Sequence, residues 1–223
     1  MILEVIGTNS AFPAEGMTVS FILWPDENKR QGVLLDCGYP VYQELLRLGY
    51  ADRLAAVCLS HNHQDHSGSA VTLLEYLGHV AKISVRLGGK AWEKLLPLAD
   101  GSSLTDYPPV SPQELQTFEV PHSKKMFCEA LFVNRCLLYS GDTAVSLLER
   151  PEAQTAAMII HDASLARNPN HCYVKDLASA PTEVRAKTYL CHYAPKDYEA
   201  MLAAAKELGL GGVLRKGDVF KLC

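Results

Sequence analysis

The stretch His61-Asn62-His63-Gln64-Asp65-His66 decides how this sequence folds, because it places three imidazoles and one carboxylate within six residues. The apolar run Leu54–Ser60 precedes it and is typical of a buried strand, so the histidines emerge at the carboxyl end of that strand. Ligand sites of open α/β sheets lie at such strand ends. His61 and His63 are two residues apart, which directs both side chains to one side of an extended segment. Imidazole and carboxylate ligands suit zinc, and also manganese or iron, so this stretch predicts a metal site.

The composition is that of an ordinary globular protein. The chain has 223 residues, of which 48% are hydrophobic, and this suits a single domain over residues 1–223. A net charge of −4 argues against binding long nucleic acids through a broad basic face. No apolar stretch approaches the roughly 18 to 20 residues that cross a bilayer. The N-terminus lacks the features of a signal peptide. The seven cysteines include no Cys-x-x-Cys pair, and they indicate buried free thiols in a reducing compartment. We therefore expect a cytoplasmic protein with no membrane partner.

Hydrophobic patterns predict that each half of the chain begins with strands and continues as α/β units. In the first half the predicted strands are Ile2–Ile6, Val19–Leu23, Val33–Asp36 and Ile83–Val85, and the helices are Val41–Leu48, Ala70–Leu77 and Ala91–Leu96. In the second half the predicted strands are Leu115–Val120, Phe127–Asn134, Cys136–Ser140, Ala157–Ile160 and Thr188–Cys191, with a last helix at Pro195–Leu208 and a short strand after it. The segment 97–112 contains four prolines and predicts a loop that could act as a lid. Two such halves fit a sheet-on-sheet sandwich with outer helices.

Three later residues, His122, Asp142 and His192, each follow a predicted strand. Taken alone, a histidine is often satisfied within a core, and Asp142 would more often cap a helix beginning near Ala144. Their order after the histidine-rich stretch instead favours a shared metal site.

With these residues in place, the chain resembles the metallo-β-lactamase-fold superfamily of metallo-hydrolases over essentially its full length. The resemblance implies an αββα four-layer sandwich of two mixed β-sheets with outer helices. It also implies two divalent metal ions, with zinc favoured and manganese or iron as alternatives. Its implied ligands are His61, His63 and His122 on the first metal, Asp65, His66 and His192 on the second, and Asp142 bridging both. A hydroxide bridged between such metals is the expected nucleophile, which Asp65 could also position.

Two further segments resemble the ribonuclease Z and cyclic phosphodiesterase-like branch of this superfamily. Val5–Pro13 looks like its glycine-turn start, and Ile159–Leu165 looks like its His-Glu-Ala-Thr segment with Asp162 in place of Glu. His171 lies 21 residues before His192, close to the spacing at which that branch places a catalytic histidine. The resemblance implies that His171 protonates the leaving oxygen and that Asp162 orients its ring.

These features favour a phosphodiesterase acting on a cyclic nucleotide, a cyclic ribose phosphate or a short oligonucleotide. The chain lacks the long glycine- and lysine-rich insertion with which ribonuclease Z grips tRNA, and Asp142 stands where antibiotic-degrading β-lactamases carry a cysteine ligand. Lys124 and Tyr193 are expected to contact the substrate. One alternative is thioester or lactone hydrolysis at the same site, as in glyoxalase II-like enzymes. Another is a non-hydrolytic metal-binding or diiron redox protein. Dimerisation is common in this superfamily, which makes a homodimer one expectation.

Overall fold

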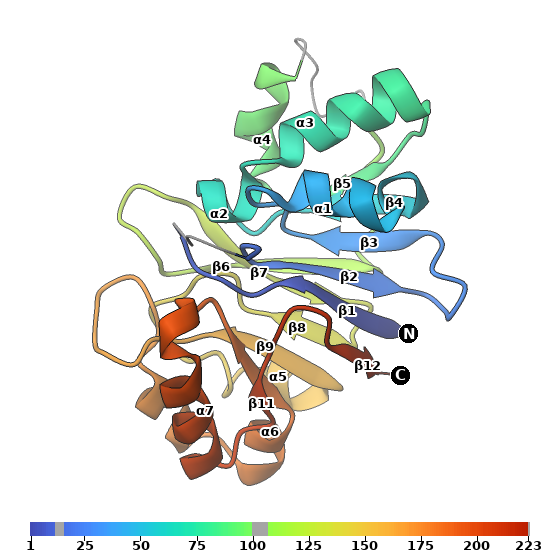
Figure 1. Ribbon diagram of the computed structural model, residues 1–223. Helices are drawn as coiled ribbons and strands as arrows, with labels where there is room; N and C mark the ends of the chain where they lie inside the picture. The colour runs from blue at the N-terminus through green and yellow to red at the C-terminus, as the bar shows by residue number, and fades with distance from the viewer. Residues whose placement is uncertain (12–15, 100–106, 223) are drawn as a thin grey trace.

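The computed structural model describes residues 1–11, 16–99 and 107–222, which form two six-stranded β-sheets packed face to face (Figure 1). The first sheet has the order β12-β1-β2-β3-β4-β5 and the second β11-β10-β9-β8-β7-β6. The strands of the first sheet are β1 (Ile2–Gly7), β2 (Ser20–Trp24), β3 (Gly32–Leu35), β4 (Leu54–Cys58), β5 (Arg86–Gly88) and β12 (Val219–Lys221). Those of the second are β6 (Leu115–Val120), β7 (Cys128–Val133), β8 (Leu137–Tyr139), β9 (Met158–Asp162), β10 (Thr188–Cys191) and β11 (Gly212–Val213). Each sheet is mixed, because it contains both parallel and antiparallel pairs of neighbouring strands.

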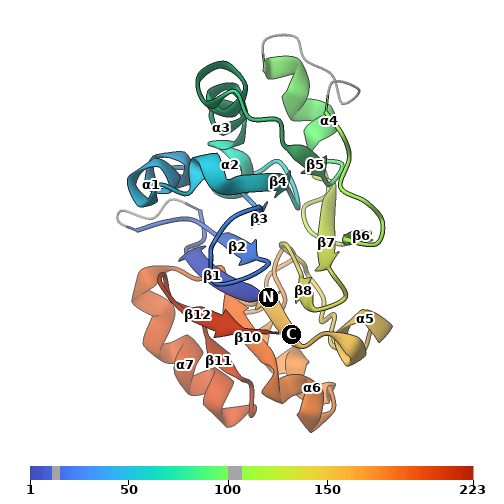
Figure 2. The ribbon, with the colours of Figure 1, turned by 90° about the vertical axis from the view of Figure 1, so that its right-hand side faces the viewer.

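Helices cover the outer face of each sheet, as Figure 1 shows above and below the strands and Figure 2 shows from the side. The first sheet is covered by α1 (Val41–Leu48), α3 (Ala70–Glu75) with its continuation η2 (Tyr76–Ala81), and α4 (Trp92–Leu95) with η3 (Leu96–Leu98). The short helix α2 (Gln64–Ser67) precedes α3 and carries Asp65 and His66. The second is covered by α5 (Pro151–Thr155), η5 (Val174–Ser179), α6 (Thr182–Ala186) and α7 (Tyr198–Glu207). The short 3-10 turns η1 (Ala51–Arg53) and η6 (Pro195–Asp197) precede β4 and α7. This arrangement confirms the predicted αββα sandwich.

Strand β2 shows why the strand sequences are unbroken runs of apolar residues. Its side chains alternate between the two faces of the sheet. Phe21 and Leu23 pack between the sheets, whereas Ile22 and Trp24 pack under the outer helices. Because both faces are buried, no polar position interrupts the sequence pattern.

Two predicted elements differ in the structure. The strand expected at Ile83–Val85 lies at Arg86–Gly88, where it pairs in parallel with β4. The helix expected near Ala144 is absent, because nearby backbone donors are taken by other partners. The Thr143 N–H donates to Asp162 Oδ2 at 3.1 Å, and the Leu147 N–H donates to His161 Nε2 at 3.0 Å. The next helix, α5, begins only at Pro151.

Three other expectations meet different outcomes. Cys37, Cys58, Cys128, Cys172 and Cys191 are buried free thiols, but Cys136 is disulfide-bonded, so the prediction of reduced cysteines is wrong for that residue. Spacing alone does not reveal which cysteines a fold brings together. Residues 100–106 of the predicted lid lie outside the described residues. Within the described ranges, no helix is long and apolar enough to cross a bilayer.

Candidate metal centre

The candidate ligands meet at one edge of the sandwich because each of them comes after the carboxyl end of a strand. His61 comes three residues after β4, and Asp142 and His192 follow β8 and β10. Strands β8, β9 and β10 are parallel neighbours, so their carboxyl ends lie together. His192 has a backbone φ of +62°, in the left-handed region that non-glycine residues rarely adopt. Its N–H donates to the Thr8 carbonyl at 2.9 Å, which ties this ligand to the loop after β1.

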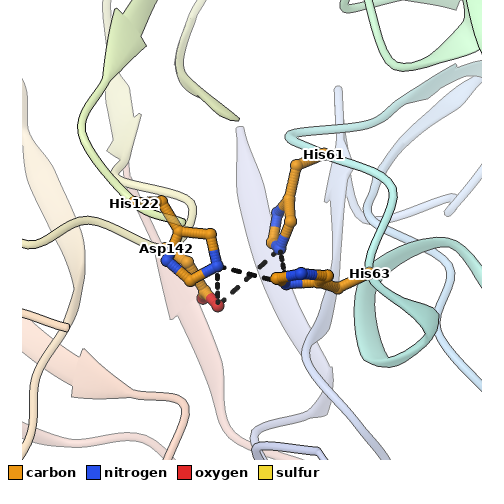
Figure 3. Close-up of side chains that lie close together, drawn as sticks. All are labelled: His61, His63, His122 and Asp142. Atoms are coloured by element: carbon orange, nitrogen blue, oxygen red, sulfur yellow. Dashed lines mark hydrogen bonds and ion pairs between the residues drawn. The ribbon is translucent and has the colours of Figure 1, made fainter. Parts of the chain in front are cut away.

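Three imidazoles and one carboxylate form the first group: His61, His63, His122 and Asp142 (Figure 3). Their ligand atoms all lie within 4.8 Å of one another. His63 Nδ1 lies 3.0 Å from His61 Nε2 and 3.1 Å from His122 Nε2. Asp142 Oδ2 lies 3.7 Å from His61 Nε2 and 3.6 Å from His122 Nε2. One cation placed among these four atoms would be held by three nitrogens and one oxygen.

A second group contains Asp65, His66 and His192. Asp65 Oδ2 lies 3.0 Å from His192 Nε2 and 3.6 Å from His66 Nε2. Asp142 adjoins this group as well, since its Oδ1 lies 3.2 Å from His66 Nε2 and its Oδ2 lies 3.5 Å from His192 Nε2. The structure therefore brings all seven predicted ligands together and places Asp142 between the two groups.

The residues fit divalent metals in two independent respects. Ligand atoms about 2.0–2.1 Å from one zinc in a tetrahedral arrangement lie about 3.3 Å apart, and the contacts above run from 3.0 to 3.7 Å. In addition, His66 Nε2 and Asp142 Oδ1 are buried without a hydrogen-bond partner although they lie close together. Buried polar atoms without a partner are costly, and a cation between them would satisfy both.

The opposite ring nitrogen of four of these histidines is held by a neighbouring group. His66 Nδ1 contacts Asp36 Oδ2 at 2.7 Å, and His61 Nδ1 contacts Ser60 Oγ at 3.0 Å. His122 Nδ1 contacts the Asn170 carbonyl oxygen at 2.8 Å, and His192 Nδ1 lies 3.3 Å from an oxygen of Asp162. Such partners fix the orientation of a ligating imidazole.

Asp36 is the residue of this centre that the sequence reasoning missed. It is fully buried just after β3, with a φ of +55°, and accepts hydrogen bonds from the Ser60 N–H at 2.7 Å, the Ser60 hydroxyl at 2.8 Å and the Tyr139 hydroxyl at 2.7 Å. The sequence did contain a signal for Asp36, because this residue stands at the end of the predicted strand Val33–Asp36, just as Asp142 follows a predicted strand.

Burial and neighbouring charges set the protonation states. Burial, reinforced by the charge of His66, holds the pKa of His61 well below its ordinary value. Burial opposes ionisation of Asp142, but His192 and His66 outweigh it and hold the carboxyl pKa well below its ordinary value. Burial would also lower the pKa of His66, yet Asp142 and Asp36 raise it. The low pKa favours the neutral form of His61 that metal binding requires, whereas His66 must release its proton before its ring can bind a metal.

His171 and Asp162 form a pair beside this centre. His171 Nδ1 lies 2.8 Å from Asp162 Oδ2, and the His171 ring stacks on His192 at 4.9 Å between centroids. Burial lowers the pKa of His171, but the hydrogen bond and charge of Asp162 outweigh that and raise it above its ordinary value. Because Asp162 engages Nδ1, Nε2 is the nitrogen left for a substrate.

A cavity of about 920 Å³ opens over both groups. Its lining includes His63, Asp65 and His171, and among the described residues that line it there is no lysine or arginine. Lys124 is exposed and does not line it. Tyr193 is 7% exposed and donates its hydroxyl to the Leu214 carbonyl at 2.6 Å. Tyr193 lines only a smaller cavity of about 350 Å³ beside His171 and His192.

Two family models match this chain. One described as the metallo-beta-lactamase superfamily matches residues 14–126, and one described as the anti-Pycsar protein Apyc1 matches residues 97–220. No curated protein matches it.

Solved structures with a similar fold cover nearly the whole chain. The metallo-beta-lactamase fold protein YhfI from Bacillus subtilis has 19% identity and a TM-score of 0.77, with 98% of each chain covered. A diphosphatase from the PhnP family has 16% identity and a TM-score of 0.68, covering 100% of this chain and 98% of its own. The short form of human tRNase Z, ELAC1, has 16% identity and a TM-score of 0.66, with 99% of each chain covered. At these identities the likeness concerns the fold.

Proposed function

The chain belongs to the metallo-β-lactamase superfamily, and on that premise we propose that it is a dinuclear metal-dependent hydrolase of small phosphodiesters. We assign His61, His63 and His122 to one divalent metal, most simply zinc, and Asp65, His66 and His192 to a second, with Asp142 shared between them. The donor set of imidazole nitrogens and carboxylate oxygens supports this assignment. We further propose that the whole chain acts as one hydrolase domain.

The observation that carries the phosphodiesterase assignment is the position of His171. Asp162 holds it at Nδ1, and it lies at the wall of the large cavity, 3.9 Å from Asp142 Oδ2. Cleavage of a phosphodiester expels an alkoxide, which is a poor leaving group unless it receives a proton. A histidine fixed beside the reacting centre by a carboxylate can donate that proton from its free nitrogen. A thiolate needs no such assistance, so the pair favours a phosphodiester over a thioester.

The remaining roles follow from charge and position. A bound pair of divalent metals supplies the positive charge that neutralises a phosphate and the acidity that makes water a nucleophile at neutral pH. The described cavity wall contributes no lysine or arginine for that purpose. We assign to Asp65, which has one oxygen 3.0 Å from His192 Nε2, the role of orienting the attacking water. Asp162 orients both His171 and His192.

The size of the cavity and two of the similar folds also favour this substrate class. A cavity of about 920 Å³ falls within the range of about 300–1,000 Å³ that is typical of small-molecule sites. Two of the similar folds carry the names tRNase Z and diphosphatase, which supports a phosphorus centre. A cyclic nucleotide, a cyclic ribose phosphate or a short oligonucleotide would fit.

Hydrolysis of adenosine 2′,3′-cyclic phosphate, whose leaving group is an alkoxide, is compared with hydrolysis of a thioester and a lactone by zinc-loaded protein to test the proposal. Three variants are compared: His63→Ala, His171→Ala and, as a matched control, His79→Ala at an exposed histidine on η2. We expect phosphodiester turnover that falls about 10²–10⁴-fold in His171→Ala, the usual contribution of a general acid, and is lost in His63→Ala. His79→Ala should retain full activity. Thioester or lactone turnover that survives His171→Ala, without phosphodiester turnover, would refute the proposal.

A further inference from the structure

We propose that Tyr39 is the surface on which an aromatic base of the substrate stacks, so that this residue selects nucleotides among phosphodiesters. This inference rests on the proposed function and adds a specificity-determining residue to it. Tyr39 belongs neither to the metal ligands nor to the His171–Asp162 pair.

The exposure of Tyr39 is unusual for an aromatic side chain. It is 64% exposed, and it is the only aromatic residue among the strongly exposed large hydrophobic side chains of the described residues. It nevertheless lines the large cavity together with Pro40, His63 and Asp65. An aromatic ring exposed at the wall of a ligand cavity has apolar area to bury only when a ligand arrives.

The backbone around Tyr39 is held firmly against the metal-binding stretch. Its N–H donates to the Gln64 carbonyl at 3.2 Å, and its carbonyl accepts the Thr18 hydroxyl at 3.2 Å. The preceding Gly38 packs so closely that an added Cβ would lie 1.9 Å from the Asp65 carbonyl oxygen. The backbone of Tyr39 is therefore fixed relative to the metal ligands, so only the side-chain torsions of the ring are left to be ordered when a base stacks on it.

The neighbouring polar groups suit the edge of a base. The side-chain amides of Gln64 and Asn170 line the same cavity, and neither has a hydrogen-bond partner within the part of the chain that the structure describes. Gln64 is next to Tyr39, because a Cβ at Gly68 would lie 2.9 Å from Gln64 Oε1 and 3.3 Å from Tyr39 Cβ. An amide offers both donors and an acceptor, whereas the charged groups of the wall are at the metal end. The phosphate would thus bind at the metal ligands and the base beside Tyr39.

The test compares substrates that differ only in the base. Adenosine 2′,3′- and 3′,5′-cyclic phosphates are assayed against the matching methyl riboside cyclic phosphates, which have no base. Stacking of one base is worth about 1–3 kcal/mol by alanine substitution, which corresponds to about 5- to 150-fold. We expect Tyr39→Ala to raise KM for the nucleotide by that factor with little change in kcat, and to change the base-free substrate less than about threefold. Tyr39→Phe should restore the nucleotide KM, because it retains the ring.

Val80→Ala is the matched control, since Val80 is 68% exposed and lines neither cavity. Equal losses on both substrates in Tyr39→Ala, or no loss on the nucleotide, would overturn the assignment of Tyr39 while leaving the phosphodiesterase intact. Absence of turnover of every phosphodiester by the wild-type protein would instead refute the proposed function, and this inference with it.

Discussion

Replacement of Tyr139 by phenylalanine tests how strongly the two sheets are joined beneath the metal centre. Tyr139 ends β8 of the second sheet, and its hydroxyl donates to Asp36 Oδ2 at 2.7 Å, just after β3 of the first. Both residues are at most 1% exposed. Tyr139→Phe removes this donor but keeps the ring that packs against Phe21 at 5.2 Å. A hydrogen bond to a charged group contributes about 1.5–3 kcal/mol, so we expect a loss of about 2 kcal/mol.

Urea unfolding of the metal-free protein measures this loss, and the melting temperature should fall by about 4–8 °C for a chain of this length. Tyr193→Phe is the comparison, since it removes a buried hydroxyl with neutral partners, which donates to the Leu214 carbonyl at 2.6 Å and accepts from the Thr8 hydroxyl at 3.2 Å; each such hydrogen bond is worth about 1 kcal/mol. If Tyr139→Phe costs no more than about 1 kcal/mol, the value of one neutral hydrogen bond, the charged acceptor does not have the effect that we assign to it.

Two further substitutions probe regions on either side of the site. Arg47, and to a lesser extent Lys216, contact the buried Glu44 and lower the pKa of its carboxyl to about 2 from 4.5. The Glu44 carboxylate therefore stabilises the fold fully above pH 4.5 and loses that effect as the pH falls through 2. We expect Glu44→Gln to lower the free energy of unfolding by about 1 kcal/mol at pH 7, a modest value because the partners of Glu44 are solvent-exposed. Near pH 2 the substitution should have almost no effect. Gly38→Ala should cost about 2 kcal/mol by overpacking against the Asp65 carbonyl, as measured by urea unfolding.

Each of these substitutions has its own control. The effect of Glu44→Gln is measured as a difference from wild type at each pH, so that protonation of the metal ligands cancels; a difference that stays constant from pH 7 to about pH 2 would show that the ion pair is not its source. Gly78→Ala is the comparison for Gly38→Ala, because an added Cβ there meets nothing within 4 Å. Equal stability of the two alanine variants would contradict the close packing at Gly38.

Much of the fold could be predicted because the strands are buried on both faces and their ends carry the polar residues. Val41–Leu48 is found as a helix with the predicted bounds, and Leu115–Val120 is found as a strand with the predicted bounds. The position of β5 and the missing helix near Ala144 could not be read from local patterns. Both depend on partners distant in sequence: β5 on pairing with β4, and the segment after Asp142 on side chains of β9.

For the site, the seven predicted metal ligands and the His171–Asp162 pair are together in space, as the motifs indicated. Asp36 and Tyr39 were not predicted. Neither belongs to a histidine-rich motif, and their proximity to the centre arises because the turn after β3 packs on the stretch that carries His66. Lys124 was expected to contact the substrate because it comes just after His122; its side chain is exposed and is not among the described residues that line the cavity.

Isothermal titration of zinc into metal-free protein tests the central claim most directly, with His79→Ala and Asp142→Asn titrated alongside. If Asp142 lies between two metal sites, the wild-type protein and His79→Ala will bind two zinc ions per chain, and Asp142→Asn will weaken both binding events. Binding of a single ion by the wild-type protein, or two ions with unchanged affinities in Asp142→Asn, would contradict a shared dinuclear centre.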